Sequence, residues 1–231
     1  MPTVMQALAG ATALAVVATV LHAPAGWLAA PAHAKKHKGP GFAAETFLNA
    51  APVATGAVRR FLINPHGEVD ALLLADGTVV KFPPHMGQEL TTAVKVNDTV
   101  SVRGYREAGD TVKAFVITNE ASKQQVVERP PVPNIAKMPK HLRFATLSRL
   151  KVTGKVDRQM RAKKGEVNGV LLEDGTVVRF PPHAAFDFAA LLQPGQTIAV
   201  EGLGSENAYG RALEATAIGP TLDAVKPIYG Q

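Results

Sequence analysis

The sequence has no cysteine, a single tryptophan and few aromatic residues. Its 231 residues include 0 Cys and 1 Trp, which is Trp27, and aromatic residues make up 6%. Without cysteine the chain has no disulfide framework, no thiolate metal site and no cysteine nucleophile. At 46% hydrophobic and 19% charged residues it is too apolar for wholesale disorder. The length suits one large domain or two small ones.

Charge of either sign is missing from the N-terminal segment up to Lys35. An apolar run at Val4–Leu21 is followed by Ala32-His33-Ala34, a small-x-small pattern. This predicts a secretory signal peptide over residues 1–34, cleaved after Ala34, and hence a periplasmic or secreted protein. No basic residue precedes the apolar run. An uncleaved membrane anchor is therefore the alternative, since about 18 apolar residues can just span a bilayer.

One unit occurs twice in the chain, at a constant shift of 98 residues. Residues 55–104 and 153–202 are identical at 21 of 50 positions without a gap. The longest matching block, at 73–85 and 171–183, reads Leu-Leu-x-Asp-Gly-Thr-Val-Val-Lys/Arg-Phe-Pro-Pro-His. Near the end of the repeat the shift becomes 101, because the second copy has a longer turn around Glu206–Tyr209. The chain therefore contains an internal duplication.

Each copy has the pattern of five short strands and one helix. In the first copy strands are expected at 58–63, 68–74, 78–82, 99–105 and 111–118, and a helix within 85–96. Asp76-Gly77 suits a tight hairpin, since glycine tolerates positive φ. Pro83-Pro84 ends the third strand, because proline cannot donate to a strand ladder. The second copy repeats the order, with its last two strands expected at 196–203 and 211–218.

This element order resembles the OB-fold, a five-stranded Greek-key barrel with a helix between strands three and four. It is similar, more loosely, to small secreted bacterial OB-fold proteins of unassigned function. The resemblance implies a mainly β protein with two tandem barrels and a binding surface on strands two and three and their adjoining loops. It implies no particular ligand, because the class includes oligonucleotide, oligosaccharide and protein binders. The expected division is a signal peptide (1–34), a basic arm (35–51), two barrels (52–119 and 152–219), the Pro-rich linker between them (120–151) and a tail (220–231).

The connecting segments carry the net charge of +6, and the barrels do not. Residues 35–50 contribute +2 and residues 120–151 contribute +5, whereas residues 51–119 are neutral and residues 152–219 carry −1. A single-strand-binding OB-fold needs a positive groove with stacking aromatics. Nucleic acid is therefore the less favoured partner. The basic linker is either an extended spacer or a contact for an acidic surface.

Basic residues recur at two pairs of equivalent positions, Arg60 with Arg158 and Lys81 with Arg179. Strand alternation turns the phenylalanine that follows Lys81 or Arg179 inward, so these two cations should face outward near the binding surface. We interpret all four as candidate contacts for an anionic envelope polymer or saccharide, or for an acidic protein. Solvated surface charge is the simpler interpretation, and it stays open.

The Pro-Pro-His motif places His85 and His183 at the start of the helix in each copy. They are candidate ligands for a metal or an anionic group, although neither has a histidine or carboxylate partner at metal-ligand spacing. The structural alternative is that each histidine packs on the barrel rim. If the two barrels face each other, the two histidines can share one site.

His37 is a separate candidate that depends on processing. Cleavage after Ala34 leaves Lys35-Lys36-His37 at the new N-terminus. A free amine with histidine in third position offers four nitrogens in a square plane, which suits Cu(II) or Ni(II). No other cofactor is expected.

Catalytic motifs are missing. The serines have no nucleophile-elbow context, and there is neither a His-Glu-x-x-His helix nor a phosphate-cradling glycine loop. Asp76 and Asp174 are the residues that their hairpins require. We therefore predict an exported, non-enzymatic binding protein that engages an anionic envelope ligand or an acidic partner. A nucleic-acid-binding OB-fold and a periplasmic metal-handling protein are the alternatives.

Overall fold

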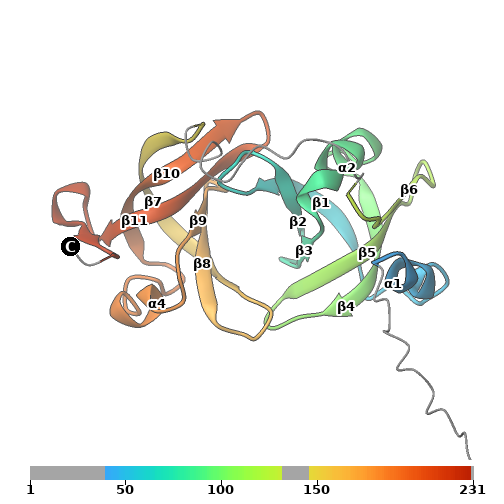
Figure 1. Ribbon diagram of the computed structural model, residues 1–231, viewed down its shortest axis with the longest axis horizontal. Helices are drawn as coiled ribbons and strands as arrows, with labels where there is room; N and C mark the ends of the chain where they lie inside the picture. The colour runs from blue at the N-terminus through green and yellow to red at the C-terminus, as the bar shows by residue number, and fades with distance from the viewer. Residues whose placement is uncertain (1–39, 132–145, 230–231) are drawn as a thin grey trace, which may run out of the picture. The chain divides into compact units, whose positions relative to one another are not determined.

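The strands of the first copy close into a barrel. The computed structural model describes residues 40–131 and 146–229. The strands are β1 (Ala54–Ile63), β2 (Val69–Leu74), β3 (Val79–Lys81), β4 (Thr99–Arg106) and β5 (Thr111–Asn119). β1 pairs with β2 and β4, β2 pairs with β3, and β4 pairs with β5, all antiparallel. The parallel pairing of β3 with β5 completes the ring (Figure 1).

The second copy closes in the same way. Its strands are β7 (Ser148–Arg161), β8 (Val167–Leu172), β9 (Val177–Arg179), β10 (Thr197–Asn207) and β11 (Gly210–Gly219). The parallel pairing of β9 with β11 closes this ring as well. The chain therefore contains two closed five-stranded barrels in the strand order of the OB-fold, and the prediction of a tandem OB-fold-like protein is confirmed.

A helical segment joins strands three and four in both barrels, as predicted. In the first barrel it consists of η1 (Pro84–Met86) and α2 (Gly87–Ala93), and in the second it is the single turn α4 (Ala184–Asp187). α2 ends before the expected residue 96 because Val94 takes an extended conformation, with φ −129° and ψ 139°. Proline at the start of η1 suits a position whose N–H needs no partner.

Further elements lie in the segments expected to be connectors. β6 (Gln125–Val127) pairs with β5, and β12 (Lys226–Pro227) pairs with β11, so each barrel carries a sixth strand. α1 (Pro40–Phe47) contacts β5, where Phe47 stacks on Phe115 with ring centroids 4.7 Å apart. η2 (Leu222–Ala224) precedes β12. The segments 120–151 and 220–231 thus contribute strands to the barrels.

The Asp-Gly hairpins have the structure that their sequence predicts. In the first barrel Asp76 Oδ1 accepts a hydrogen bond from the Thr78 N–H at 2.8 Å, and its Oδ2 accepts one from the Thr78 hydroxyl at 3.0 Å. The second barrel repeats both bonds between Asp174 and Thr176. Gly77 has φ +91°, a conformation that favours glycine. These carboxylates therefore shape turns.

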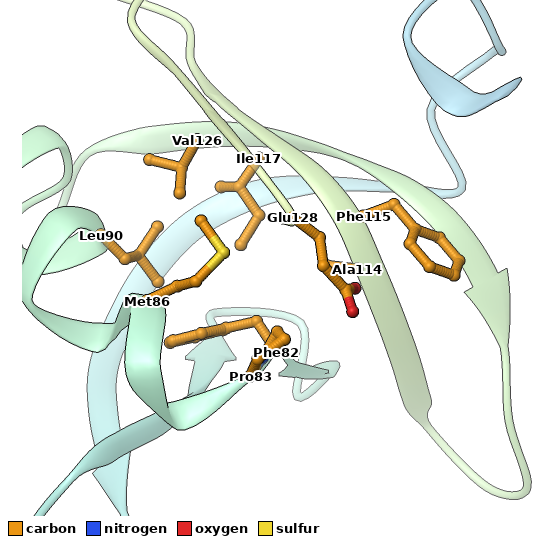
Figure 2. Close-up of a pocket in the computed structure, with 9 residues that line it drawn as sticks. All are labelled: Phe82, Pro83, Met86, Leu90, Ala114, Phe115, Ile117, Val126 and Glu128. Carbon is orange, nitrogen blue, oxygen red and sulfur yellow. The ribbon is translucent and has the colours of Figure 1, made fainter. Parts of the chain in front are cut away.

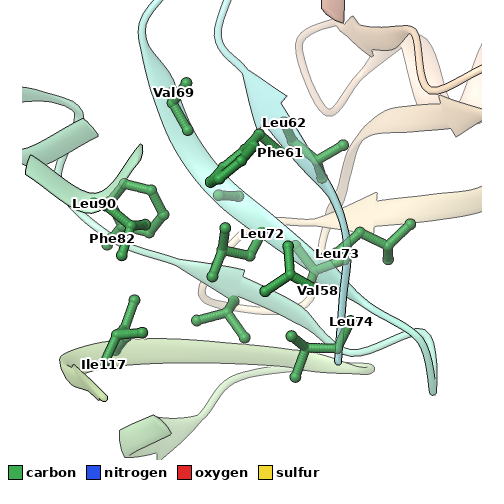
Figure 3. Packing of buried hydrophobic residues seen from close by; sticks show 14 of the residues in the cluster. Val58, Phe61, Leu62, Val69, Leu72, Leu73, Leu74, Phe82, Leu90 and Ile117 are labelled. Carbon is green, nitrogen blue, oxygen red and sulfur yellow. The ribbon is translucent and has the colours of Figure 1, made fainter. Parts of the chain in front are cut away.

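Each barrel has a hydrophobic interior. In the first, Leu72, Phe82 and Leu90 gather inside the ring of strands, with Leu90 supplied by α2 (Figure 3). Phe180 and Leu192 occupy the second core. The inward orientation expected of both phenylalanines is confirmed, since Phe82 is 8% exposed and Phe180 is 3% exposed.

The predicted signal peptide and its alternative, a membrane anchor, lie outside the described residues. Within residues 40–131 and 146–229 no helix has both the length and the apolar character needed to cross a membrane. The described residues, 40–131 and 146–229, fall within one compact unit, so the two barrels belong to the same body.

Candidate functional site

The outer face of strands two and three, where OB-fold proteins bind their ligands, is covered in this chain. Leu73 and Val79 are cross-strand neighbours on that face, opposite to the inward Leu72. They are nevertheless only 1% and 5% exposed. They belong to one hydrophobic cluster with their equivalents in the second repeat, Leu171 and Val177. The two repeats therefore bury the same face against each other.

The loops beside these faces also meet. Ser205 Oγ, on β10, donates to the Pro65 carbonyl at 2.9 Å. Asn207 Nδ2, at the end of the same strand, donates to the Gly67 carbonyl at 2.8 Å. The β1–β2 turn of the first repeat is thereby fixed to the β10–β11 hairpin of the second. These are the two loops that flank the binding face of an OB-fold.

The reciprocal pair of loops is also in contact. A Cβ placed on Gly165, in the β7–β8 turn, would lie 3.6 Å from the Ala108 Cβ, in the β4–β5 turn. Lys163, which also lies in the β7–β8 turn, has its Nζ 5.8 Å from the ring centroid of Tyr105 on β4. In each repeat, the turn between strands one and two therefore contacts the turn between strands four and five of the other repeat. The junction is thus formed by equivalent loops of the two copies.

Arg60 and Arg158 each reach the Asp-Gly hairpin of the other repeat. Arg158 Nη1 donates to the Gly77 carbonyl, and its Nε donates to Asp157 at 2.8 Å. The Arg60 guanidinium lies so close to Gly175 that a Cβ there would overlap it. The positive φ at each hairpin tip favours glycine, and the arginine of the other repeat lies directly beside it.

Lys81 and Arg179 occupy the same junction and have acidic neighbours there. Lys81 Nζ donates to the Arg161 carbonyl at 2.8 Å and lies 3.5 Å from a Glu107 carboxylate oxygen. Arg179 Nη2 lies 3.8 Å from an Asp70 carboxylate oxygen. Burial lowers the pKa of Lys81 and raises the pKa of Asp70, and in each case the opposite charge nearby only partly offsets burial.

The structure thus brings all four predicted anion contacts to the junction between the repeats, where groups of the protein surround them. These basic residues recur at equivalent positions of the two copies, and in both copies they lie where one repeat joins the other. Binding of an anionic ligand by these residues stays a prediction.

His85 and His183 contact different surroundings. His85 Nε2 lies 2.8 Å from the Arg129 carbonyl and is exposed at the start of the helical segment. The His183 ring meets the edge of Tyr229, with centroids 6.4 Å apart. The contacts of each histidine are made within its own repeat. Among the described residues no group of three metal-binding side chains occurs, and the candidate His37 lies outside them.

Two grooves flank the helical segment of the first repeat. One, of about 430 Å³, lies between α2, the β1–β2 turn and residues 207–209 of the second repeat. The other, of about 620 Å³, lies between α2 and β6. His85 and Gln88 line both. Sequence reasoning placed only His85 there. The signal that it did not use was the longer turn at Glu206–Tyr209, which forms one wall.

The space beneath α2 offers no further cavity. Met86 and Leu90 point from the helical segment toward Ile117 and Val126, and these side chains fill the end of the barrel (Figure 2). The volume left is about 10 Å³, close to the minimum for a single water molecule.

Comparisons with known proteins identify no family. No protein-family model matches the chain, and no curated protein matches it. Among solved structures, one match is a deletion mutant of the single-stranded DNA binding protein from Thermus aquaticus. It shows 13% identity and a TM-score of 0.23, and it covers 76% of this chain and 95% of that one. So low a TM-score does not establish a shared fold, and the OB-fold assignment rests on the strand order described above.

Proposed function

We propose that this protein is an exported, non-catalytic binding protein whose ligand is a polysaccharide of the cell envelope. Export is supported by the signal-like sequence of residues 1–34. The observation that carries the choice of site is the burial of the usual OB-fold binding face between the repeats, with the open grooves lying beside α2.

The groove chemistry favours saccharide hydroxyls. Amide and hydroxyl side chains occur in the walls of both grooves, and Gln88 lines both. No hydrogen bond to the side-chain amide of Gln88 occurs among the described residues, so both its oxygen and its NH₂ are available to a ligand. Open grooves of a few hundred Å³ with several convergent polar groups are typical of binding sites.

The charge of the grooves is unfavourable for nucleic acid. Arg129 is the one arginine or lysine that lines them, and it forms an ion pair with Glu89. Glu68 adds a further negative charge to the groove beside the hairpin. A single-strand-binding groove instead tracks the phosphates with positive charge. Nucleic acid is therefore the competing outcome in the binding experiment.

The non-catalytic part of the proposal is supported by the positions of the obvious carboxylates. Asp76 and Asp174 are bonded into hairpin turns. Glu89 is paired with Arg129. Hydrolysis of a glycosidic bond needs a pair of free carboxylates that act as acid and base. None of these three carboxylates belongs to such a pair.

The test is co-sedimentation of the full-length protein, expressed with its own N-terminus, with purified peptidoglycan sacculi and, separately, with immobilised single-stranded DNA. We expect binding to sacculi that persists as salt is raised, and Gln88→Ala should weaken it about fivefold through loss of hydrogen bonds. Gln196→Ala is the matched control, because Gln196 is exposed and lines neither groove. Binding to DNA alone, falling steeply with salt, would overturn the proposal.

Export has its own measurement. Mass spectrometry of the N-terminus of protein recovered from the expressing cells should show cleavage after Ala34. An intact Met1 in protein recovered from the cytoplasm would contradict export.

A further inference from the structure

The longer β10–β11 hairpin breaks the symmetry of the duplication. The shift between the copies rises from 98 to 101 at this turn, and β10 spans 11 residues against 8 in β4. The added residues reach the first repeat, where Asn207, Ala208 and Tyr209 form a wall of the groove beside α2. This groove is therefore made by both repeats, and neither contains it alone.

The hairpin tip is held in place before any ligand arrives. Ser205 and Asn207 donate to carbonyls of the β1–β2 turn at 2.9 and 2.8 Å. The Tyr209 N–H donates to Asn207 Oδ1 at 2.9 Å. Behind the tip, Arg211 forms two bonds of 2.8 and 3.0 Å with the Glu206 carboxylate. Such fixed geometry reduces the ordering cost of binding.

Tyr209 is the aromatic residue of this wall. Its ring meets Phe61 edge to face, with centroids 5.5 Å apart and planes at 78°. Phe61 is buried at 7% exposure, whereas Tyr209 is 43% exposed. Phe61 thus fixes the tyrosine from one side, and the rest of the ring remains open to the groove. An apolar ring with a polar hydroxyl suits a ligand that is itself part apolar and part polar.

Other polar groups that line the groove can complete a subsite. Gln88 on α2 and Glu68 after the β1–β2 turn line the same groove as Tyr209. The floor is tight, because a Cβ on Gly87 would overlap the Val69 carbonyl. The groove therefore combines an exposed aromatic side chain with hydrogen-bonding groups in its lining, the combination that a sugar ring requires.

We propose that this groove is a saccharide subsite, in which one sugar ring of the polymer stacks on Tyr209 and its hydroxyls bond to Gln88 and Glu68. The inference rests on the proposed function and adds the residue that selects the ligand. Because the site is shared, its ligand also links the second repeat to the first.

The test is isothermal titration of a neutral N-acetylglucosamine tetramer into the full-length protein and its variants. Tyr209→Ala should bind about tenfold more weakly or worse, as expected for loss of an aromatic anchor. Tyr209→Phe should bind like the wild type, because it keeps the stacking face. Tyr229→Ala is the matched control, since Tyr229 is a similarly exposed tyrosine, at 49%, that does not line this groove.

The outcomes separate the two proposals. Thermal unfolding of each variant establishes that it is folded, and if Tyr209→Ala is unstable, Tyr209→Leu tests stacking, because it keeps an apolar side chain but has no aromatic face. If the wild type binds saccharide and Tyr209→Ala binds equally well, the subsite is wrong while the proposed function stands. If the wild type binds neither the tetramer nor sacculi, the proposed function fails. A loss of the same size in Tyr229→Ala would also overturn the subsite.

Discussion

The residues at position 70 and its equivalent, 168, differ between the repeats, and the difference matters because both are half-buried. Asp70 lies beside Arg179, and the second repeat has Asn168 at the matching position. Neither Asp70 Oδ1 nor Asn168 Oδ1 has a hydrogen-bond partner among the described residues. Burial raises the pKa of Asp70 despite the attraction of Arg179 and Lys81. The ionised carboxylate is thus less favourable in the folded chain than in the unfolded chain.

The stability of the folded chain should therefore depend on pH through Asp70. The contribution of this group is fully present below its ordinary pKa of 3.8 and is lost as pH rises through its higher folded-state pKa. Asp70→Asn removes this titration, so the variant should gain stability relative to the wild type between about pH 3 and pH 7. Urea unfolding of the variant and the wild type, at about pH 3 and at about pH 7, measures this difference in the free energy of unfolding. A difference that shrinks as pH rises would contradict the assignment.

Arg158 gives a second prediction for a single side chain. Its hydrogen bond to the Gly77 carbonyl crosses between the repeats. Arg158→Ala should lower the free energy of unfolding by about 1–2 kcal/mol, because a charged hydrogen bond is lost where the groups are half-buried. Arg149→Ala is the control, since the Arg149 side chain is exposed and makes no hydrogen bond or ion pair among the described residues. Equal unfolding midpoints for the two variants would mean that the Arg158 contact contributes nothing.

At the scale of the element, the recurring glycines of strand four explain how each barrel closes. β4 has a bulge between Arg103 and Gly104, and β10 has one between Glu201 and Gly202. A bulge bends a strand and increases its twist, which allows it to pair with strands one and five of the same barrel. At both glycines a Cβ would overlap a carbonyl of the paired strand, Lys113 or Glu214.

Gly104→Ala should therefore destabilise the first barrel by about 2–3 kcal/mol, since the added methyl has no space against backbone. Gly56→Ala provides the control. A Cβ there would meet Leu74 at 3.6 Å, an ordinary contact, and the backbone conformation is not one restricted to glycine. Urea unfolding of both variants compares them. Similar midpoints would show that the bulge adjusts to a side chain.

Strand two shows a signal in the sequence that points to the junction. Residues 71–74 read Ala-Leu-Leu-Leu, with no polar residue on either face. A strand with one wet face alternates, whereas a continuous apolar run indicates burial on both faces. All four residues are in fact buried. The run could have predicted a covered outer face, although it does not say what covers it.

At the scale of the whole molecule, the two repeats share a hydrophobic cluster. Met160, Leu171, Val177 and Ala212 of the second repeat belong to the same cluster as the core of the first. Their side chains lose contact with water only when both barrels are formed. The stability of each repeat is therefore coupled to that of the other.

We expect the two repeats to unfold together. Differential scanning calorimetry should show one transition whose calorimetric enthalpy equals its van't Hoff enthalpy. Arg158→Ala should shift this transition without splitting it. Two resolved transitions in the wild type would show that the buried faces contribute little to stability.

The sequence alone determined the duplication, the strand order, the Asp-Gly hairpins and the inward phenylalanines. These follow from local rules, since a hairpin depends on a few adjacent residues and an alternating strand on its own pattern. It also identified Arg60, Lys81, Arg158 and Arg179 as recurrent cations and predicted that Lys81 and Arg179 face outward. Their partners, and the wall that Tyr209 adds to the groove, were decided only by the tertiary structure. Which surface faces which depends on contacts between residues about a hundred positions apart, and no local pattern in the chain specifies that pairing.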